Sequence, residues 1–281
     1  MQNSLKRSDG RANGHLRSLK ASFDIFGYTA GSILFELGNT KVLCSVTMQP
    51  GVPPFLKGTG TGWLTAEYSM LPTATSIRTQ RESTTMKKNG RSVEISRLIS
   101  RALRSVISLD KLGERTITID CDVLQADGGT RTACITGAYF ALEHSVNYWV
   151  STQQLPPSIL KDSIVAVSAG IFQGESILDP DFSEDSAIDS DFNFVINKSD
   201  AIIEVQGTAE KKPVSWDQFE QLKNLAICGA HQLFTFFEQQ NIAQKSPVAP
   251  AVVQSEPVSN NKQGKKNKDA PMFSLMNRMA Q

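Results

Sequence analysis

Cysteine and histidine are scarce in this chain of 281 residues, and neither is grouped as a metal site would need. The four cysteines lie far apart, each inside an apolar stretch, and the three histidines are equally scattered; they are Cys44, Cys121, Cys134, Cys228, His15, His144 and His231. Without CxxC spacing a zinc site is not expected, and a cysteine–histidine nucleophilic pair has little support. We predict that the cysteines are buried free thiols.

Long hydrophobic runs are also missing. The apolar stretches extend over only a few residues, so none of them could span a bilayer. Residues 1–9 are polar and contain no apolar core of a signal peptide. We therefore expect a cytoplasmic protein that has no membrane partner.

A large excess of one charge is absent as well. The net charge is only +1, and the shares of hydrophobic residues (40%) and charged residues (20%) are ordinary for a globular chain. The stretch 245–278 holds six basic and two acidic side chains, which leaves residues 1–243 at about −3. A strongly basic surface that coats RNA is thereby excluded, and any RNA contact must come from local clusters.

Composition divides the chain into a body, residues 1–243, and a basic tail, residues 244–281. The stretch 246–269 is rich in Pro, Ser, Asn, Gln and Lys and nearly lacks large apolar residues, which predicts a disordered linker. The more apolar end, 271–281, is interpreted most simply as frayed. The alternative is a docking motif for a protein partner, carried by Phe273, Leu275 and Met276.

Strand-like segments are frequent in the body. Two β-prone runs, 32–38 and 40–46, meet at Gly38-Asn39, which is a hairpin signal. The segment 116–124 alternates apolar and polar residues with a period of two, as a half-buried strand does. The hairpin predicts at least one antiparallel pair of strands.

Three helices are predicted between and after these strands. From Ser92 one apolar stripe forms at helical spacing, made of Ile95, Leu98, Ile99, Ala102 and Val106. A second, more apolar helix is predicted from Thr130 to about Val150, and a capping box at 215–218 opens a third. Strands outnumber helices, and hairpins mix with helical crossovers, so we predict an α+β fold with mixed sheets and packed helices.

A basic cluster lies in the first half of the chain. Between residues 78 and 104 only Glu82 and Glu94 oppose eight basic side chains, which are Arg78, Arg81, Lys87, Lys88, Arg91, Arg97, Arg101 and Arg104. Residues 73–90 are predicted to form a loop, from which arginines could reach an RNA backbone. A solvated charged surface is the simpler interpretation of such a run.

Two glycine–arginine steps precede predicted helices. The first is 89–92 (NGRS) and the second is 127–131 (DGGTR). A helix start presents unpaired backbone N–H groups and the positive end of the helix dipole, and an arginine adds a bidentate fork. Together they could cradle a phosphate, although glycine-rich turns also open many helices that bind nothing. The run 58–62 (GTGTG) lacks a nucleotide-loop frame and is expected to pack backbone closely at a subunit or strand contact.

An acidic stretch follows in the second half of the body. Residues 171–197 contain no Lys or Arg but include Glu175, Asp179, Asp181, Glu184, Asp185, Asp189 and Asp191. Carboxylates without a local ion-pair partner can bind a hard divalent cation such as Mg²⁺. An acidic surface loop is the simpler interpretation from composition alone.

Several longer motifs resemble the RNase PH family of phosphorolytic exoribonucleases, and its bacterial members in particular. The resemblance extends from about residue 6 to residue 240 and is carried by segments 7–11 (RSDGR), 38–44 (GNTKVLC), 54–72, 112–133, 178–187 (LDPDFSEDSA) and 204–210 (EVQGTAE). It implies the fold shared with the second domain of ribosomal protein S5. It also implies a homo-hexameric ring of three dimers that trims tRNA precursors at their 3′ ends. Inorganic phosphate would be the co-substrate, and nucleoside diphosphates would be the products.

The resemblance also implies roles for individual residues. Phosphate would be held by Arg91, Gly129, Thr130 and Arg131. Asp185 and Asp191 would be the catalytic or Mg²⁺-binding carboxylates, and Arg78 and Arg81 would grip the RNA. One departure is Thr73, which stands where the family usually has an RNA-binding arginine. Two rival hypotheses are a non-catalytic RNA-binding ring subunit of an exosome-like assembly and a hydrolytic, metal-dependent nuclease.

Overall fold

Five strands of the first half of the body form one mixed sheet. The computed structural model describes residues 7, 9–85 and 89–243. The sheet has the order β1-β2-β3-β5-β4, in which only β4 and β5 run parallel. Its strands are β1 (Leu19–Phe23), β2 (Gly31–Leu37), β3 (Thr40–Pro50), β4 (Trp63–Met70) and β5 (Arg115–Gln125). The predicted hairpin is confirmed as β2 and β3, which pair from Gly31 opposite Val46 to Leu37 opposite Thr40.

The second half of the body contributes a four-stranded sheet. Its order is β7-β6-β8-β9, and all of its pairs are antiparallel. The strands are β6 (Ile164–Phe172), β7 (Glu175–Leu178), β8 (Ser190–Asn197) and β9 (Ile202–Ala209). The prediction of an α+β fold with mixed sheets is confirmed, with the parallel pair lying in the five-stranded sheet.

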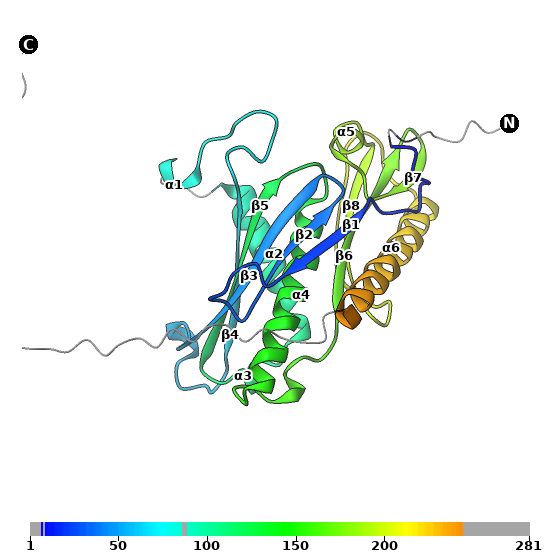
Figure 1. Cartoon of the computed structure of the whole chain (residues 1–281). Helices are drawn as coiled ribbons and strands as arrows, with labels where there is room; N and C mark the ends of the chain where they lie inside the picture. Colours follow the sequence, from blue (N-terminus) through cyan, green and yellow to red (C-terminus); the bar gives the residue numbers. More distant parts are fainter. Residues whose placement is uncertain (1–6, 8, 86–88, 244–281) are drawn as a thin grey trace, which may run out of the picture. The chain divides into compact units, whose positions relative to one another are not determined.

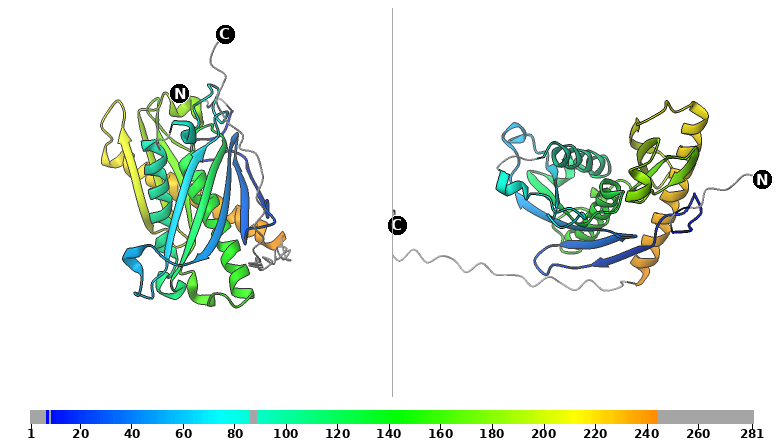
Figure 2. Two further views of the ribbon diagram at one scale, coloured as in Figure 1. Left: turned by 90° about the vertical axis from the view of Figure 1, so that its left-hand side faces the viewer. Right: turned by 90° about the horizontal axis from the view of Figure 1, so that it is seen from above.

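Three long helices pack on these sheets, and the shorter helices lie in connections. The long ones are α2 (Gly90–Val106), α4 (Thr130–Ser151) and α6 (Trp216–Ala243); the short ones are α1 (Glu82–Thr85), α3 (Leu109–Leu112), α5 (Phe182–Asp185) and the 3₁₀ turns η1 (Pro54–Leu56) and η2 (Pro157–Ile159). Helix α4 contacts β2 and β3 of one sheet and β6 of the other, while α2 lies on β4 and α6 on β6 and β7 (Figures 1 and 2). Helix α4 therefore connects the two sheets.

The helices bury the faces that their sequences predict. On α2 the stripe Ile95, Leu98, Ile99, Ala102 and Val106 is at most 1% exposed. Helix α4 is buried on nearly all sides, which explains why its sequence is apolar throughout rather than on one stripe. The capping box before α6 is confirmed by two hydrogen bonds, because the Ser215 N–H donates to Gln218 Oε1 and the Gln218 N–H donates to Ser215 Oγ.

Some expectations need correction. Residues 73–90 are not entirely loop, because α1 forms a helical turn at 82–85. Three cysteines are buried free thiols as predicted, but Cys228 lies on the exposed side of α6. In the glycine-rich run Gly62 packs closely within the chain, since a Cβ there would lie 2.6 Å from the Gly113 carbonyl oxygen. Gly58 and Gly60 have open space within the chain and adopt positive φ, so a subunit contact at these two glycines stays a prediction.

The predictions for the basic tail and for two lysines of the basic cluster fall on residues that the structure does not describe. The tail 244–281 and the lysines at 87 and 88 are not described. Within the described part of the chain, no helix has both the length and the apolarity that crossing a bilayer requires.

Candidate active site

The start of α4 is an uncapped helix N-terminus. Gly128 and Gly129 have φ values of 76° and 64°, which favour glycine, and a Cβ on Gly128 would lie 2.6 Å from the Pro180 carbonyl oxygen. Gly129 is the N-cap, and no side chain accepts a hydrogen bond there. The first backbone N–H groups of α4, with the positive end of its dipole, are thus left for an anion.

The start of α2 is different. The Asn89 side chain accepts a hydrogen bond from the Arg91 backbone N–H at 3.1 Å, which is ordinary capping. Of the two glycine–arginine steps, the one before α4 has no side-chain cap, whereas the one before α2 is capped by Asn89 and contributes the Arg91 side chain to the site. Behind the α4 start, the Tyr68 hydroxyl lies 3.1 Å from Thr130 Oγ1, and burial raises the pKa of Tyr68 to about 12, so the phenol keeps its proton.

The two aspartates of the acidic stretch come from neighbouring elements. Asp185 ends α5, a short helix whose N-cap Asp181 accepts from the Ser183 and Glu184 N–H groups. Asp191 lies at the second position of β8. Its carboxylate accepts a hydrogen bond from Asn193 Nδ2 at 3.1 Å, and Asn193 Oδ1 accepts one from Ser168 Oγ at 2.6 Å. This short chain of polar groups fixes the Asp191 side chain.

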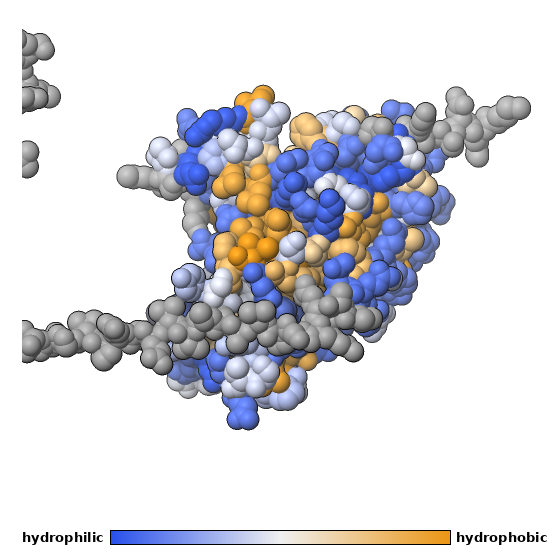
Figure 3. All heavy atoms as spheres, in the orientation of Figure 1, coloured by the Kyte–Doolittle hydropathy of each residue, from blue (hydrophilic) through white to orange (hydrophobic). Residues whose placement is uncertain are grey.

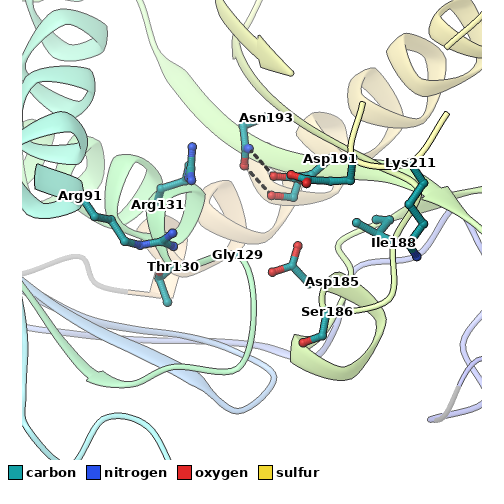
Figure 4. Close-up of a pocket in the computed structure, with 12 residues that line it drawn as sticks. Arg91, Gly129, Thr130, Arg131, Asp185, Ser186, Ile188, Asp191, Asn193 and Lys211 are labelled. Carbon is teal, nitrogen blue, oxygen red and sulfur yellow. Dashed lines mark hydrogen bonds between the residues drawn. The ribbon is translucent and has the colours of Figure 1, made fainter. Parts of the chain in front are cut away.

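One cavity of about 440 Å³ brings these groups together. Figure 4 shows Arg91, Thr130 and Arg131 on one side of it and Asp185 and Asp191 on the other. The remaining lining residues are Gly129, Ser168, Ser186, Ile188, Asn193, Glu210 and Lys211. All six residues predicted to bind phosphate or to act as carboxylates therefore line a single cavity.

The two carboxylates lie in an environment that disfavours their charge. Burial is the largest cause that raises the pKa of Asp191, and the charge of Asp185 raises it further. Burial also raises the pKa of Asp185, against the opposing effects of Arg91 and Arg131. A cation between the two aspartates would relieve this repulsion, and an anion beside the arginines would complete the charge balance of the cavity.

Buried arginines near the N-terminus hold the acidic and glycine-rich segments in place. Arg7 is 2% exposed and binds Glu184 with two hydrogen bonds of 2.8 and 2.6 Å. Arg17 binds Asp179 in the same way, at 2.9 and 2.7 Å, and its Nη2 also donates to the Gly128 carbonyl oxygen at 3.3 Å. Asp179 and Glu184 are therefore scaffold rather than metal ligands.

The arginines predicted to bind RNA do not line the cavity. Arg78 is exposed and donates to the Thr79 carbonyl oxygen. Burial raises the pKa of Asp122 in β5, and the nearby charge of Arg81 opposes this rise. Two further arginines of the basic cluster serve the fold: Arg101 pairs with Glu204 at 2.5 Å, and Arg104 lies 3.8 Å above the Trp63 ring.

Six lining residues were not predicted as site residues from the sequence: Ser168, Ser186, Ile188, Asn193, Glu210 and Lys211. Ser168 lies inside the apolar strand β6, where nothing distinguishes it, and Asn193 lies two positions after Asp191 on the same face of β8. Glu210 and Lys211 directly follow β9. Lys211 Nζ donates to the Ala187 carbonyl oxygen at 2.5 Å and lies 3.6 Å from Asp189, which ties it to the connection between the two aspartates. For Glu210 and Lys211 the sequence offered the charged run 210–212 (EKK), and Glu210 also ends the motif 204–210.

Among the described residues, no group of three or more His, Cys, Asp or Glu side chains is placed to hold a metal ion. Three carboxylates line the cavity, those of Asp185, Asp191 and Glu210, but they do not form such a group, so the two aspartates are the candidate ligands. This donor set fits Mg²⁺ better than zinc, since Mg²⁺ is commonly held by one or two carboxylates together with water and substrate phosphates.

Comparison with known proteins agrees with this architecture. Residues 15–146 match domain 1 of the 3′ exoribonuclease family (RNase PH), and residues 162–228 match its domain 2. The first match contains the whole five-stranded sheet, with α2 and most of α4. The second contains the four-stranded sheet and the first half of α6. The predicted α+β fold of the RNase PH type is thereby confirmed.

Solved structures show the same fold. Rice (Oryza sativa) Rrp46 is 19% identical, with a TM-score of 0.68 over 83% of this chain and 99% of that chain. A chain of the Archaeoglobus fulgidus exosome with RNA bound to the active site is 23% identical, with a TM-score of 0.70 over 83% and 92%. A chain of an archaeal exosome core is 22% identical, with a TM-score of 0.66 over 83% and 91%.

Proposed function

The chain belongs to the 3′ exoribonuclease family, and from that premise we propose that it removes 3′-terminal nucleotides from RNA by phosphorolysis. One observation carries the proposal: two arginines and an uncapped helix start face two aspartates across a cavity of about 440 Å³. The arginine side fits inorganic phosphate, and the space between the two sides fits the last phosphodiester of an RNA.

The reaction follows from this placement. Inorganic phosphate binds to Arg91, Arg131 and the N–H groups at the start of α4, which aim one of its oxygens at the terminal phosphorus. That oxygen forms the new P–O bond while the bond to the 3′-oxygen of the preceding nucleotide breaks, so a nucleoside diphosphate leaves and the RNA is one nucleotide shorter. The arginines stabilise the charge that spreads over the phosphoryl oxygens.

The aspartates act on the opposite side of the same phosphorus. Because their pKa values are raised, one carboxyl of the pair can carry a proton toward the departing 3′-oxygen. Asp185 and Asp191 would also be the residues that hold Mg²⁺, which when bound supplies positive charge to the phosphate oxygens.

The products distinguish phosphorolysis from hydrolysis. With a 3′-extended tRNA as substrate, we expect nucleoside diphosphates in phosphate buffer and almost no nucleotide release in phosphate-free buffer. Chromatography of the released nucleotides checks this. Nucleoside monophosphates, released equally fast without phosphate, would show a hydrolase instead.

The substrate, the assembly and the compartment are part of the same proposal. The motifs that resemble bacterial RNase PH imply transfer-RNA precursors as the substrate and a homo-hexameric ring as the assembly. The cytoplasm is the compartment expected from a sequence that contains no long apolar run. The outer face of the five-stranded sheet, where hydrophobic side chains gather among hydrophilic ones (Figure 3), is a surface available for subunit contact. On it the cross-strand pair Leu34 and Leu43 is only partly buried. The presence of both arginines and both aspartates in one cavity favours an active enzyme over a non-catalytic ring subunit.

The position of Asp191 depends on a glycine in the neighbouring strand. Gly170 pairs with Asp191, and a Cβ at position 170 would lie 2.2 Å from Ile188 Cδ1 and 2.3 Å from the Ser190 carbonyl oxygen. We expect Gly170→Ala to displace the start of β8, to lower the free energy of unfolding by about 1–3 kcal/mol and to reduce kcat about 10-fold or more. Denaturant unfolding and phosphorolysis assays measure the two effects.

The matched control is Gly27→Ala, where the added Cβ meets nothing within 4 Å. A Gly170→Ala protein as stable and as active as the Gly27→Ala protein would contradict the close packing inferred at this strand pair.

A further inference from the structure

A second cavity opens directly from the candidate active site. It has a volume of about 760 Å³ and shares Arg91, Gly129, Thr130 and Asp185 with the first cavity. Its other walls come from residues 73–76, from the end of β5 and from Phe182 of α5. We call this second cavity the side groove. Any substrate bound at the shared residues has part of its structure next to the side groove.

The charge of the side groove does not suit an RNA backbone. Among the described residues that line it, Arg91 is the sole cation, and it belongs to the shared end. Asp127 and Asp185 are also part of the lining, and the wall 73–76 consists of small uncharged side chains (TATS). Backbone phosphates would meet carboxylates here, so a neutral part of the nucleotide fits better.

Phe182 supplies a flat apolar surface at this place. The residue is 61% exposed, and within the described part of the chain its ring stacks on no other aromatic side chain. It lies one helical turn before Asp185 on α5, so both side chains are on the same side of this helix. Met70 and Leu124 add apolar surface elsewhere in the groove.

The backbone that carries Phe182 is held firmly. Its N–H donates to Asp127 Oδ1 at 3.3 Å, and its carbonyl oxygen accepts from the Ser186 N–H at 3.0 Å. The neighbouring Glu184 is anchored by Arg7. An exposed aromatic ring on a fixed backbone contributes little to folding but can bind a flat partner without a large loss of conformational entropy.

We propose that Phe182 is a stacking platform for a nucleobase, and that the side groove holds the base of one of the two nucleotides that flank the cleaved bond. The inference rests on the proposed function only in naming which bases are involved. According to this proposal, the protein recognises RNA next to the cleaved bond by base stacking. The wall of the groove carries Thr73 there, not a basic side chain. Because every base has an aromatic face, the platform tolerates any sequence.

The test compares variants on matched RNAs. Loss of one base–aromatic stack is expected to weaken RNA use by about 10-fold, so Phe182→Ala should raise the KM for RNA about 10-fold while the KM for phosphate stays within about 2-fold. Phe182→Trp should retain wild-type KM, and Phe182→Leu should resemble Phe182→Ala, because leucine keeps the apolarity but lacks a ring. Tyr28→Ala removes another aromatic residue, 83% exposed and outside the groove, and serves as the control.

Abasic substrates identify the base. RNAs that lack the base at the last or the next-to-last nucleotide are compared with intact RNA. At one of these two positions, removal of the base should weaken wild-type turnover and leave the Phe182→Ala variant unaffected. If Phe182→Ala weakens all three RNAs equally, or weakens none of them, the stacking platform is wrong.

A binding measurement separates this inference from the catalytic proposal. Short RNAs with 2-aminopurine at each of the two positions are mixed with the protein in phosphate-free buffer, where no turnover is expected. Stacking on Phe182 should quench the fluorescence of one of them, and Phe182→Ala should abolish the quenching. Phe182-dependent quenching by a protein that lacks phosphorolytic activity would uphold the platform and overturn the proposed reaction. Phosphorolysis by the wild-type protein without Phe182-dependent quenching would overturn the platform and uphold the proposed reaction.

Discussion

Replacing Arg91 with alanine is expected to reduce kcat/KM for phosphate about 100-fold while changing the KM for RNA less than about 3-fold. Arg91 lines the anion side of the cavity, and its backbone N–H is already bonded to the Asn89 side chain. Its contribution to phosphate binding therefore comes from the guanidinium group alone. Initial rates over a matrix of phosphate and RNA concentrations separate the two constants.

Two further variants test the reason for the loss. Arg97→Ala removes a positive charge from an exposed position of the same helix, outside the cavity, and should leave both constants near wild type. Arg91→Lys keeps the charge but loses the planar fork, so it should recover only part of the activity. If Arg97→Ala raised the KM for phosphate as much as Arg91→Ala, the effect would be long-range electrostatics and the phosphate site would be misplaced.

Local patterns predicted the elements of the fold because each pattern has a single local cause. The Gly38-Asn39 turn, the stripe from Ile95 to Val106 and the capping box at Ser215 each depend on residues close together in the chain. The pairing within the second sheet could not be predicted in the same way. Parallel and antiparallel strands carry similar apolar patterns, and the direction of β8 relative to β6 is decided by hydrogen bonds between strands that β7 and α5 separate in the chain.

The candidate site was predicted in part, but from the resemblance to a family rather than from local patterns, which left simpler interpretations open. Arg91, Arg131 and the two aspartates belong to motifs, and the structure places them around one cavity. The acidic stretch was harder to interpret, because the partner of Glu184 is Arg7, which lies 177 residues away in sequence. No local signal distinguishes a carboxylate with such a partner from one that is free for a metal.

Replacing Asp191 with asparagine should change activity and stability in opposite directions. Asp191→Asn should reduce kcat about 10²–10³-fold, because the asparagine can neither carry the proton nor hold a metal. The same substitution should raise Tm by about 2–4 °C, since it removes a buried negative charge that Asp185 repels. The asparagine can still accept the hydrogen bond from Asn193 Nδ2, so the local packing is kept.

The gain in stability expected for Asp191→Asn depends on pH, and the direction of this dependence follows from the pKa of Asp191. Since burial raises the pKa of Asp191 in the folded protein, the folded state binds the proton more tightly than the unfolded state does. The wild-type protein therefore loses stability from this group as pH rises from the ordinary aspartate pKa of 3.8 through the raised pKa. The advantage of Asp191→Asn should be complete above the raised pKa and should vanish below 3.8.

Thermal unfolding of both proteins across this pH range, without divalent cations, measures the difference directly. Mg²⁺ should then raise the Tm of the wild-type protein at neutral pH but not that of Asp191→Asn, because only the carboxylate pair can bind the cation. Asp189→Asn, a substitution in the same connection but outside the cavity lining, is the control and should retain the Mg²⁺ response. A variant at position 191 that is less stable than wild type at neutral pH would show that Asp191 is held by a favourable ion pair, and the site would have to be reconsidered as scaffold.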